Sequence, residues 1–151
     1  IECIAFYGAL TRDLLPIAMT NEPMRDAAPT MCVEEFARHG IPTAITTDDG
    51  TCGLVGRVTE ALNRYLDGLS DRTSSSLYAC GPEPMLHAVA DLATKFQVGC
   101  ELAMERVMGC GMGTCQSCVI PVRDADRAEG WRYALCCTEG PIFGAHQVIW
   151  R

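Results

Sequence analysis

Five of the ten cysteines in this 151-residue chain fall between positions 110 and 137. Three of them, Cys110, Cys115 and Cys118, have the spacing C-x4-C-x2-C, and the adjacent pair Cys136 and Cys137 follows. Cysteine thiolates bind iron–sulfur clusters and zinc. No basic and apolar signal peptide opens the sequence, so we expect a reducing compartment, the cytoplasm, and a metal site rather than disulfides.

The spacing of the first three cysteines matches that of plant-type [2Fe–2S] proteins. Because three thiolates must converge on one small cluster, the chain has to wrap around it. Gly109, Gly111 and Gly113 permit the unusual backbone angles that this requires, and they let amide groups approach the sulfurs. A structural zinc site more often uses two C-x2-C units, and disulfides suit a secreted protein. The pattern therefore predicts a [2Fe–2S] cluster, and spacing alone leaves the fourth ligand open between Cys136 and Cys137.

The residues before the cysteine motif alternate between strand and helix patterns. Strands are expected at 1–7, 41–46 and 77–80, and helices at 31–39, 57–67 and from Pro82 to about residue 97. Thr30 can cap the first helix, and Thr47-Asp48-Asp49-Gly50 is a turn signal. This alternation predicts an α/β fold with a parallel sheet and helices on its faces. Helical periodicity ends after residue 99, so we expect an α/β domain at 1–99 and a small β-rich cluster module at 100–151.

Two short segments lie where parallel strands are expected to end, which is where ligands bind in open α/β sheets. Cys80, Gly81 and Pro82 follow a predicted strand and open a helix; the alternative is a plain strand-to-helix turn. Asp48 and Asp49 can accept hydrogen bonds from a ribose, whereas the alternative is a β-turn, because Asp-Gly is favoured there anyway. These five residues are the candidate dinucleotide-binding residues.

The charge balance argues against several classes of partner. The chain has 12 basic and 19 acidic residues, which gives a net charge of −7. Nucleic acids and anionic membrane surfaces both attract positively charged proteins, so neither is an expected partner. No apolar run approaches the roughly 20 residues of a membrane span. His39, His87 and His146 lie apart from the cysteine motif, so we expect surface or helix residues there rather than ligands.

Several motifs together resemble the electron transfer subunit of NAD-dependent dihydroorotate dehydrogenase, a member of the ferredoxin reductase superfamily. In chain order, the motifs are Tyr7–Thr11, Thr46–Gly53, Tyr78–Leu86, Glu101–Cys115 and Cys137–Phe143. The resemblance implies an NAD-binding domain of ferredoxin reductase type followed by a [2Fe–2S] module. It also implies that the segment from Cys80 to Pro82 lies near the nicotinamide. The family's fourth cluster cysteine stands three residues before a Gly-Pro pair, so the implied ligands are Cys110, Cys115, Cys118 and Cys137.

The family's role implies what the whole protein does. An N-terminal barrel carries FAD, and the subunit pairs with an FMN-containing dihydroorotate dehydrogenase catalytic subunit, as a heterotetramer. Dihydroorotate reduces FMN, electrons cross the cluster, and NAD⁺ is reduced at FAD, which supports pyrimidine biosynthesis. The subunit is thus part of an oxidoreductase and is not catalytic alone.

This sequence departs from the family pattern in three ways. The barrel, the first strand of the NAD domain and its glycine-rich loop have no counterpart, which suggests a fragment. Leu10 stands where many relatives have arginine, and the absence of basic residues from Tyr7–Thr11 favours NAD over NADP. The stretch Thr20–Pro29 is longer than the family's usual connection. Two other functions stay open: the electron-input subunit of another complex, such as a hydrogenase or a ferredoxin–NAD(P) oxidoreductase, and a zinc-stabilised interaction module without a redox role.

Overall fold

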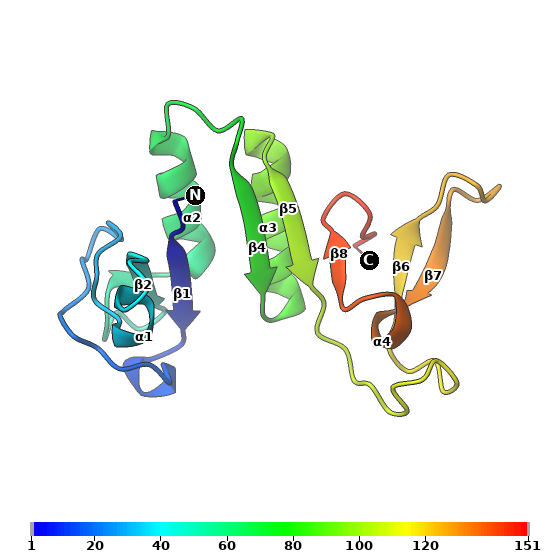
Figure 1. The fold of residues 1–151 in the computed structure, drawn as a ribbon, viewed down its shortest axis with the longest axis horizontal. Helices are drawn as coiled ribbons and strands as arrows, with labels where there is room; N and C mark the ends of the chain where they lie inside the picture. The colour runs from blue at the N-terminus through cyan, green and yellow to red at the C-terminus, as the bar shows by residue number, and fades with distance from the viewer. Residues whose placement is uncertain (1, 151) are drawn as a thin grey trace. The chain divides into compact units, whose positions relative to one another are not determined.

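The structure is a computed structural model that describes residues 2–150. The chain divides into two compact units, Ile1–Leu69 and Ser70–Arg151, and each contains a pair of parallel strands with a helix packed on it (Figure 1). The expected α/β fold with parallel strands is therefore confirmed. No helix in the described part of the chain has the length and apolar character needed to cross a bilayer.

The first unit is built on a three-stranded parallel sheet with the order β1-β2-β3. Its strands are β1 (Ala5–Ala9), β2 (Thr43–Thr47) and β3 (Leu54–Val55). All five residues of the central strand β2 are buried, and its β-branched composition suits a strand covered on both faces. Helix α2 (Val58–Gly68) packs against β1 and β2. Its buried residues are Ala61, Leu62 and Leu66, and the helix agrees with the one expected at 57–67.

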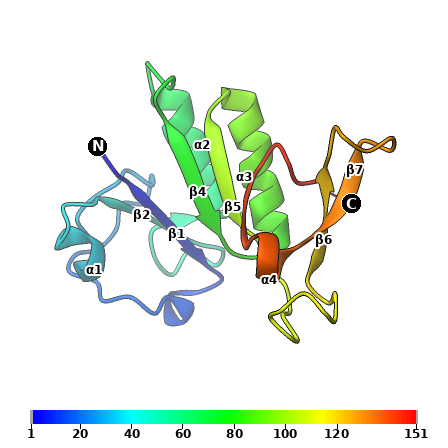
Figure 2. The same cartoon turned by 45° about the vertical axis from the view of Figure 1, so that its right-hand side comes forward.

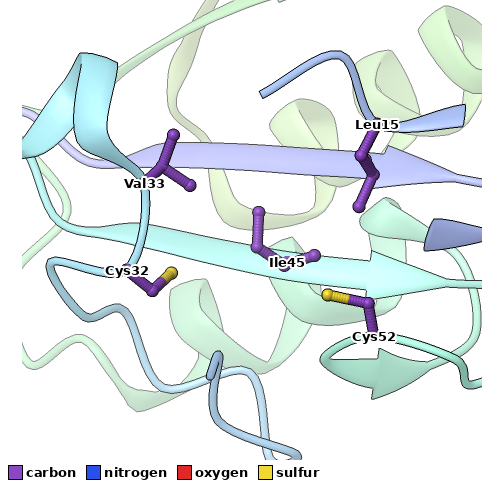
Figure 3. Close-up of a cluster of buried hydrophobic side chains, with 5 residues drawn as sticks. All are labelled: Leu15, Cys32, Val33, Ile45 and Cys52. Carbon is purple, nitrogen blue, oxygen red and sulfur yellow. The ribbon is translucent and has the colours of Figure 1, made fainter. Parts of the chain in front are cut away.

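The long connection between β1 and β2 provides a second apolar cluster of this unit. It contains the 3-10 helix η1 (Arg12–Leu14) and the short helix α1 (Glu34–Ala37). Figure 3 shows Ile45 of β2 facing side chains from this connection and from the loop after β2. The buried members of the cluster are Leu15, Cys32, Val33, Ile45 and Cys52. Cys32 and Cys52 thus serve as packing residues.

The helix expected at 31–39 is shorter than predicted, and Thr30 does not cap it. The backbone of Thr30 pairs with that of Thr43 in both directions, at 3.1 and 2.7 Å, and Val33 bridges to Met19. Because Thr30 and Val33 pair with other segments as strands do, the helix begins only at Glu34. Tertiary pairing outweighs the local helical pattern here.

The second unit begins with β4 (Ser76–Cys80), α3 (Glu83–Phe96) and β5 (Gly99–Ala103). Strands β4 and β5 are parallel, and α3 packs against both of them (Figure 2). The helix starts directly after Pro82, as predicted, and ends at Gln97, which has a left-handed backbone. Its buried residues are Leu86, Val89, Ala90 and Ala93.

The remainder of the second unit consists of short elements. Strand β8 (Ile142–Gly144) pairs antiparallel with β5, so β5 spans the boundary expected near residue 100 and links both sides of it. Strands β6 (Val119–Arg123) and β7 (Trp131–Leu135) form an antiparallel hairpin. The one-turn helix α4 (Cys136–Glu139) follows. Short strands and loops were expected in this part, whereas α4 was not.

Candidate metal centre

The β6–β7 hairpin brings the two parts of the cysteine motif together. Cys118 directly precedes β6, and Cys136 directly follows β7. Because Val119 pairs with Leu135, the residues flanking the hairpin meet at its open end, where the Cys136 amide donates to the Cys118 carbonyl at 3.1 Å. The hairpin thereby returns α4, which carries Cys137, to the loop that carries the other three cysteines.

Cys110 and Cys115 form one sulfur pair. The Cys110 Sγ accepts hydrogen bonds from the backbone amides of Cys115 at 3.4 Å and Met112 at 3.5 Å. These two amides, together with a hydrogen bond from the Cys115 side chain, lower the pKa of Cys110 to about 6. The Cys110 thiol is therefore largely ionised at neutral pH, in the form that binds metals.

Cys118 and Cys137 form the second sulfur pair. A side-chain hydrogen bond with Cys118 is the largest cause of a raised pKa at Cys137, and burial adds to it. A hydrogen bond from the Gly113 backbone amide lowers the pKa of Cys137. The charge of Cys110 raises it. The four cysteines predicted as ligands therefore form two hydrogen-bonded pairs, Cys110 with Cys115 and Cys118 with Cys137, and the charge of Cys110 acts on Cys137.

The adjacent residue Cys136 has a different environment. It is completely buried, and burial is the main cause of its raised pKa. Cys137 is only half-buried and hydrogen-bonds to Cys118. This geometry supports Cys137 over Cys136 as fourth ligand, an assignment that stays a prediction.

Two of the three motif glycines adopt the conformation expected of them. Gly111 and Gly113 have φ of +70° and +86°, in the left-handed region that favours glycine. Gly109 does not have a positive φ, so the prediction of an unusual backbone angle there was wrong. A Cβ there would lie 3.4 Å from both Cys115 Sγ and Ser117 Oγ, which is close to ordinary van der Waals contact. Gln116 also has a positive φ, of +56°, which sequence reasoning missed.

The donor set of this centre fits a binuclear iron cluster. Two thiol pairs and several backbone N–H groups lie in this part of the chain, and thiolates with amide hydrogen bonds are the usual environment of iron–sulfur clusters. Within residues 2–150, no three His, Cys, Asp or Glu side chains converge on a point suited to one metal ion. Four cysteines can hold either a [2Fe–2S] cluster or a tetrahedral zinc ion, and the C-x4-C-x2-C spacing favours the cluster. The three histidines expected to be surface residues, His39, His87 and His146, are exposed.

The segment Cys80–Pro82 lies at the carboxyl end of β4, as predicted. Cys80 is exposed, and Pro82 is the residue before α3. Gly81 has φ of +153°, and a Cβ on it would lie 2.7 Å from the Met85 Cε atom. Only glycine fits this turn without rearrangement. The segment's role beside a nicotinamide stays a prediction.

The structure distinguishes the two aspartates that were candidates for ribose binding. Asp49 Oδ1 accepts hydrogen bonds from the Thr51 amide at 3.0 Å and the Thr51 hydroxyl at 2.7 Å. These bonds lower the pKa of Asp49, the amide bond contributing most. One Asp49 oxygen is thus engaged in the turn, as the alternative interpretation expected. Asp48 is exposed, and its amide bonds to the Ala9 carbonyl at the end of β1 at 3.1 Å.

A pocket of about 390 Å³ in the first unit was missed by sequence reasoning. Its lining residues are Arg12, Met19, Thr20, Asn21, Glu22, Thr51 and Cys52. They come from the segments that follow β1 and β2, and three of them belong to the stretch Thr20–Pro29. Neither Asp48 nor Asp49 lines it. The available signal was Arg12, the basic residue that directly follows Tyr7–Thr11.

Comparisons with known proteins add to this geometry. Residues 105–149 match the family model of the iron–sulfur cluster binding domain of dihydroorotate dehydrogenase B, a span that contains all four candidate ligands. The dihydroorotate dehydrogenase B (NAD(+)) electron transfer subunit of Desulforamulus reducens is 32% identical over 126 residues. That of Geobacillus thermodenitrificans is 42% identical over 115 residues. This chain is a relative of these electron transfer subunits.

The matches to these electron transfer subunits cover most of this chain but only part of the relatives. They cover 83% and 76% of this chain, and 46% and 40% of the respective relatives. The chain therefore spans less than half the length of the curated relatives it matches. Because these alignments span 126 and 115 residues, the match reaches beyond the cluster segment at residues 105–149.

The fold also has a counterpart among solved structures. A chain of the NADH-dependent reduced ferredoxin–NADP oxidoreductase, described for flavin-based electron bifurcation, superimposes with a TM-score of 0.69. The match covers 99% of this chain and 45% of that one, at 23% sequence identity. This likeness shows a fold of ferredoxin reductase type. The absence of the first strand and the glycine-rich loop of an NAD domain stays a prediction.

Proposed function

We propose that this chain is the NAD-binding and cluster-binding part of the electron transfer subunit of an NAD-dependent dihydroorotate dehydrogenase. The observation that carries the proposal is the presence of two hydrogen-bonded cysteine pairs inside the segment that matches the family's iron–sulfur domain. In the whole protein, electrons pass from FMN of the catalytic subunit to NAD by way of a [2Fe–2S] cluster and FAD. This reaction belongs to pyrimidine biosynthesis, and the complex is a heterotetramer.

Cys110, Cys115, Cys118 and Cys137 hold the [2Fe–2S] cluster in this proposal. When bound, the cluster supplies one-electron transfer between two flavins, each of which takes two electrons. The chain's own contribution is electrostatic. The amides of Met112 and Cys115 donate to Cys110, and the charge on the sulfurs is stabilised by such donors. No side chain is required as a catalytic acid or base.

The other cofactors are assigned with the same reasoning. Cys80, Gly81 and Pro82 lie beside the nicotinamide of NAD, at the carboxyl end of β4. Asp48 is the better ribose ligand of the two aspartates, since Asp49 already accepts two bonds in its turn. FAD is bound by the full-length protein.

The zinc alternative is tested by the metal content of the protein. After anaerobic purification or reconstitution, we expect about two irons and two sulfides per chain and the brown colour of a [2Fe–2S] protein. Zinc thiolates are colourless, so a colourless protein with one zinc ion per chain and no sulfide would remove the redox proposal.

The identity of the fourth ligand is tested by two neighbouring variants. Cys137→Ala is expected to abolish the visible absorption of the cluster, since one iron loses a thiolate. Cys136→Ala is the matched control, and it is expected to keep the absorption because Cys136 packs in the interior. The reverse result would assign Cys136 as the ligand.

The substrate and partner are tested with the full-length protein. We expect it to co-elute with an FMN-binding dihydroorotate dehydrogenase catalytic subunit and to reduce NAD⁺ when dihydroorotate is added. NAD(P) reduction driven by hydrogenase or reduced ferredoxin, without activity on dihydroorotate, would instead support the second redox hypothesis.

A further inference from the structure

Ser117 lies between the second and third cysteines of the motif, and its hydroxyl has three polar neighbours. The Gly109 amide donates to Ser117 Oγ at 3.2 Å, and Ser117 Oγ donates to the Val107 carbonyl at 3.0 Å. The same oxygen lies 3.2 Å from Cys115 Sγ, a contact in which either atom can be the donor. One side chain thus connects the segment before Cys110 with a predicted cluster ligand.

The number of protons on the two side chains decides whether Ser117 or Cys115 is the hydrogen-bond donor. A hydroxyl has one proton to donate and two lone pairs to accept with. When Cys115 is a thiol, its proton can point to Ser117 or to Cys110, and the Ser117 hydroxyl donates to Val107. A cysteine bound to iron is a thiolate and has no proton. In that state only Ser117 can be the donor, and a charged sulfur is a stronger acceptor than a neutral carbonyl.

We propose that Ser117 donates a hydrogen bond to the cluster ligand Cys115 and thereby raises the reduction potential of the bound cluster. This inference rests on the proposed function. Reduction adds negative charge, part of which lies on the ligand sulfurs, so a donor at Cys115 stabilises the reduced form more than the oxidised form. The amide of Gly109, which donates to the same hydroxyl, polarises its O–H bond and strengthens it as a donor.

This donor differs from the others around the cysteines. Cys110 receives its hydrogen bonds from the backbone amides of Met112 and Cys115, which residues of nearly any type would supply. The donor at Cys115 is a side chain, so its presence depends on a serine or threonine at position 117. Ser117 is therefore a residue that tunes the potential through Cys115, and the effect can be removed by substitution.

The experiment is a redox titration of the reconstituted protein, followed by electron paramagnetic resonance of the reduced cluster. Ser117→Ala is expected to move the midpoint potential to a lower value, and Ser117→Thr, which keeps the hydroxyl, to restore it. Resonance Raman spectra supply a readout that a purely structural role would not move. The deuterium sensitivity of the iron–cysteine stretching bands is expected to weaken in Ser117→Ala. Ser74→Ala, which removes an exposed serine hydroxyl elsewhere in the same unit, is the control and is expected to change neither readout.

The outcomes separate this inference from the proposed function. Ser117→Ala could bind the cluster with an unchanged potential and unchanged deuterium sensitivity. In that case the wild-type Ser117 hydroxyl donates to the Val107 carbonyl and not to Cys115, and the inference is overturned, while the cluster assignment stands. Ser117→Gly is a second variant without the hydroxyl. If neither variant retains a cluster, Ser117 serves assembly rather than tuning, which also overturns the inference. A wild-type protein without iron and sulfide would instead overturn the proposed function.

Discussion

Arg106 Nη1 donates to Glu83 Oε2 at 2.7 Å, and this ion pair joins the two candidate sites of the second unit. Glu83 is the first residue of α3, directly after the segment Cys80–Pro82. Arg106 lies in the segment that leads into Cys110. Their hydrogen bond is the largest cause of a lowered pKa at Glu83 and of a raised pKa at Arg106. The start of the cysteine loop is thus fixed to the helix that follows the proposed nicotinamide segment.

Glu83→Gln is expected to destabilise the protein at neutral pH by up to about 1 kcal/mol, since its side chain is 44% exposed and solvent weakens the pair. The folded pKa of Glu83 lies below its unfolded value, so the stabilisation is present above about pH 4.3 and is lost as the pH falls through the folded pKa. Urea unfolding of both proteins at several pH values measures this. The difference between them should shrink in acid, and Glu105→Gln, at an exposed residue nearby, should show no such trend.

Gly53→Ala is expected to destabilise the first unit by about 3 kcal/mol or more. Gly53 has φ of +68°, and a Cβ on it would overlap the carbonyl oxygen of Ile45 in the central strand. Gly40 has the same φ and nothing within 4 Å of the added atom, so Gly40→Ala should cost only about 1–2 kcal/mol. Hydrogen exchange of the β2 amides measures the destabilisation caused by each of the two substitutions. Equal protection in the two variants would contradict the close approach at Gly53.

Most elements of the α/β part follow from local patterns, and the errors occur where distant pairing decides. The helix α2 and the start of α3 at Glu83 agree with the helices expected at 57–67 and from Pro82. The helix expected at 31–39 is shortened to Glu34–Ala37, because Thr30 pairs with Thr43 and Val33 pairs with Met19. Strand β3 has only two residues, and β8 has three, so neither carries a readable pattern of its own. Both exist because a neighbouring strand pairs with them.

The candidate site could be predicted to the extent that its residues are close in sequence. The spacing of Cys110, Cys115 and Cys118 predicts three ligands without any structure. The choice between Cys136 and Cys137 depends on how the β6–β7 hairpin and α4 turn the chain, which spacing does not encode. The pocket near Arg12 was missed for the same reason, because two loops that are distant in sequence form it.

Glu139→Ala is expected to speed the loss of the cluster several-fold when the loaded protein is exposed to air or to a chelator. Glu139 Oε1 accepts from the Leu135 amide at 2.9 Å, and its Oε2 pairs with Arg132 Nη2 at 2.6 Å. These contacts hold α4, which carries Cys137, against β7. The decay of visible absorption measures the rate. Glu129→Ala, at an exposed residue of the hairpin connection, is the control and should decay like the wild type.

Cys100 is expected to react with iodoacetamide at pH 8 roughly two orders of magnitude more slowly than a thiol with an ordinary pKa. Burial raises the pKa of Cys100 to about 11, and the charge of Glu101 adds to the effect. Only about one Cys100 side chain in a thousand is then a reactive thiolate at pH 8. Because the ionised fraction grows tenfold per pH unit below the pKa, the labelling rate should rise steadily between pH 8 and pH 10.

Peptide mapping of the folded, cluster-loaded protein measures this, with the exposed Cys3 as internal reference. Labelling of Cys100 and Cys3 at equal rates at pH 8 would show that the Cys100 thiol is open to solvent, and that the strand β5 that carries it does not hold its position between β4 and β8.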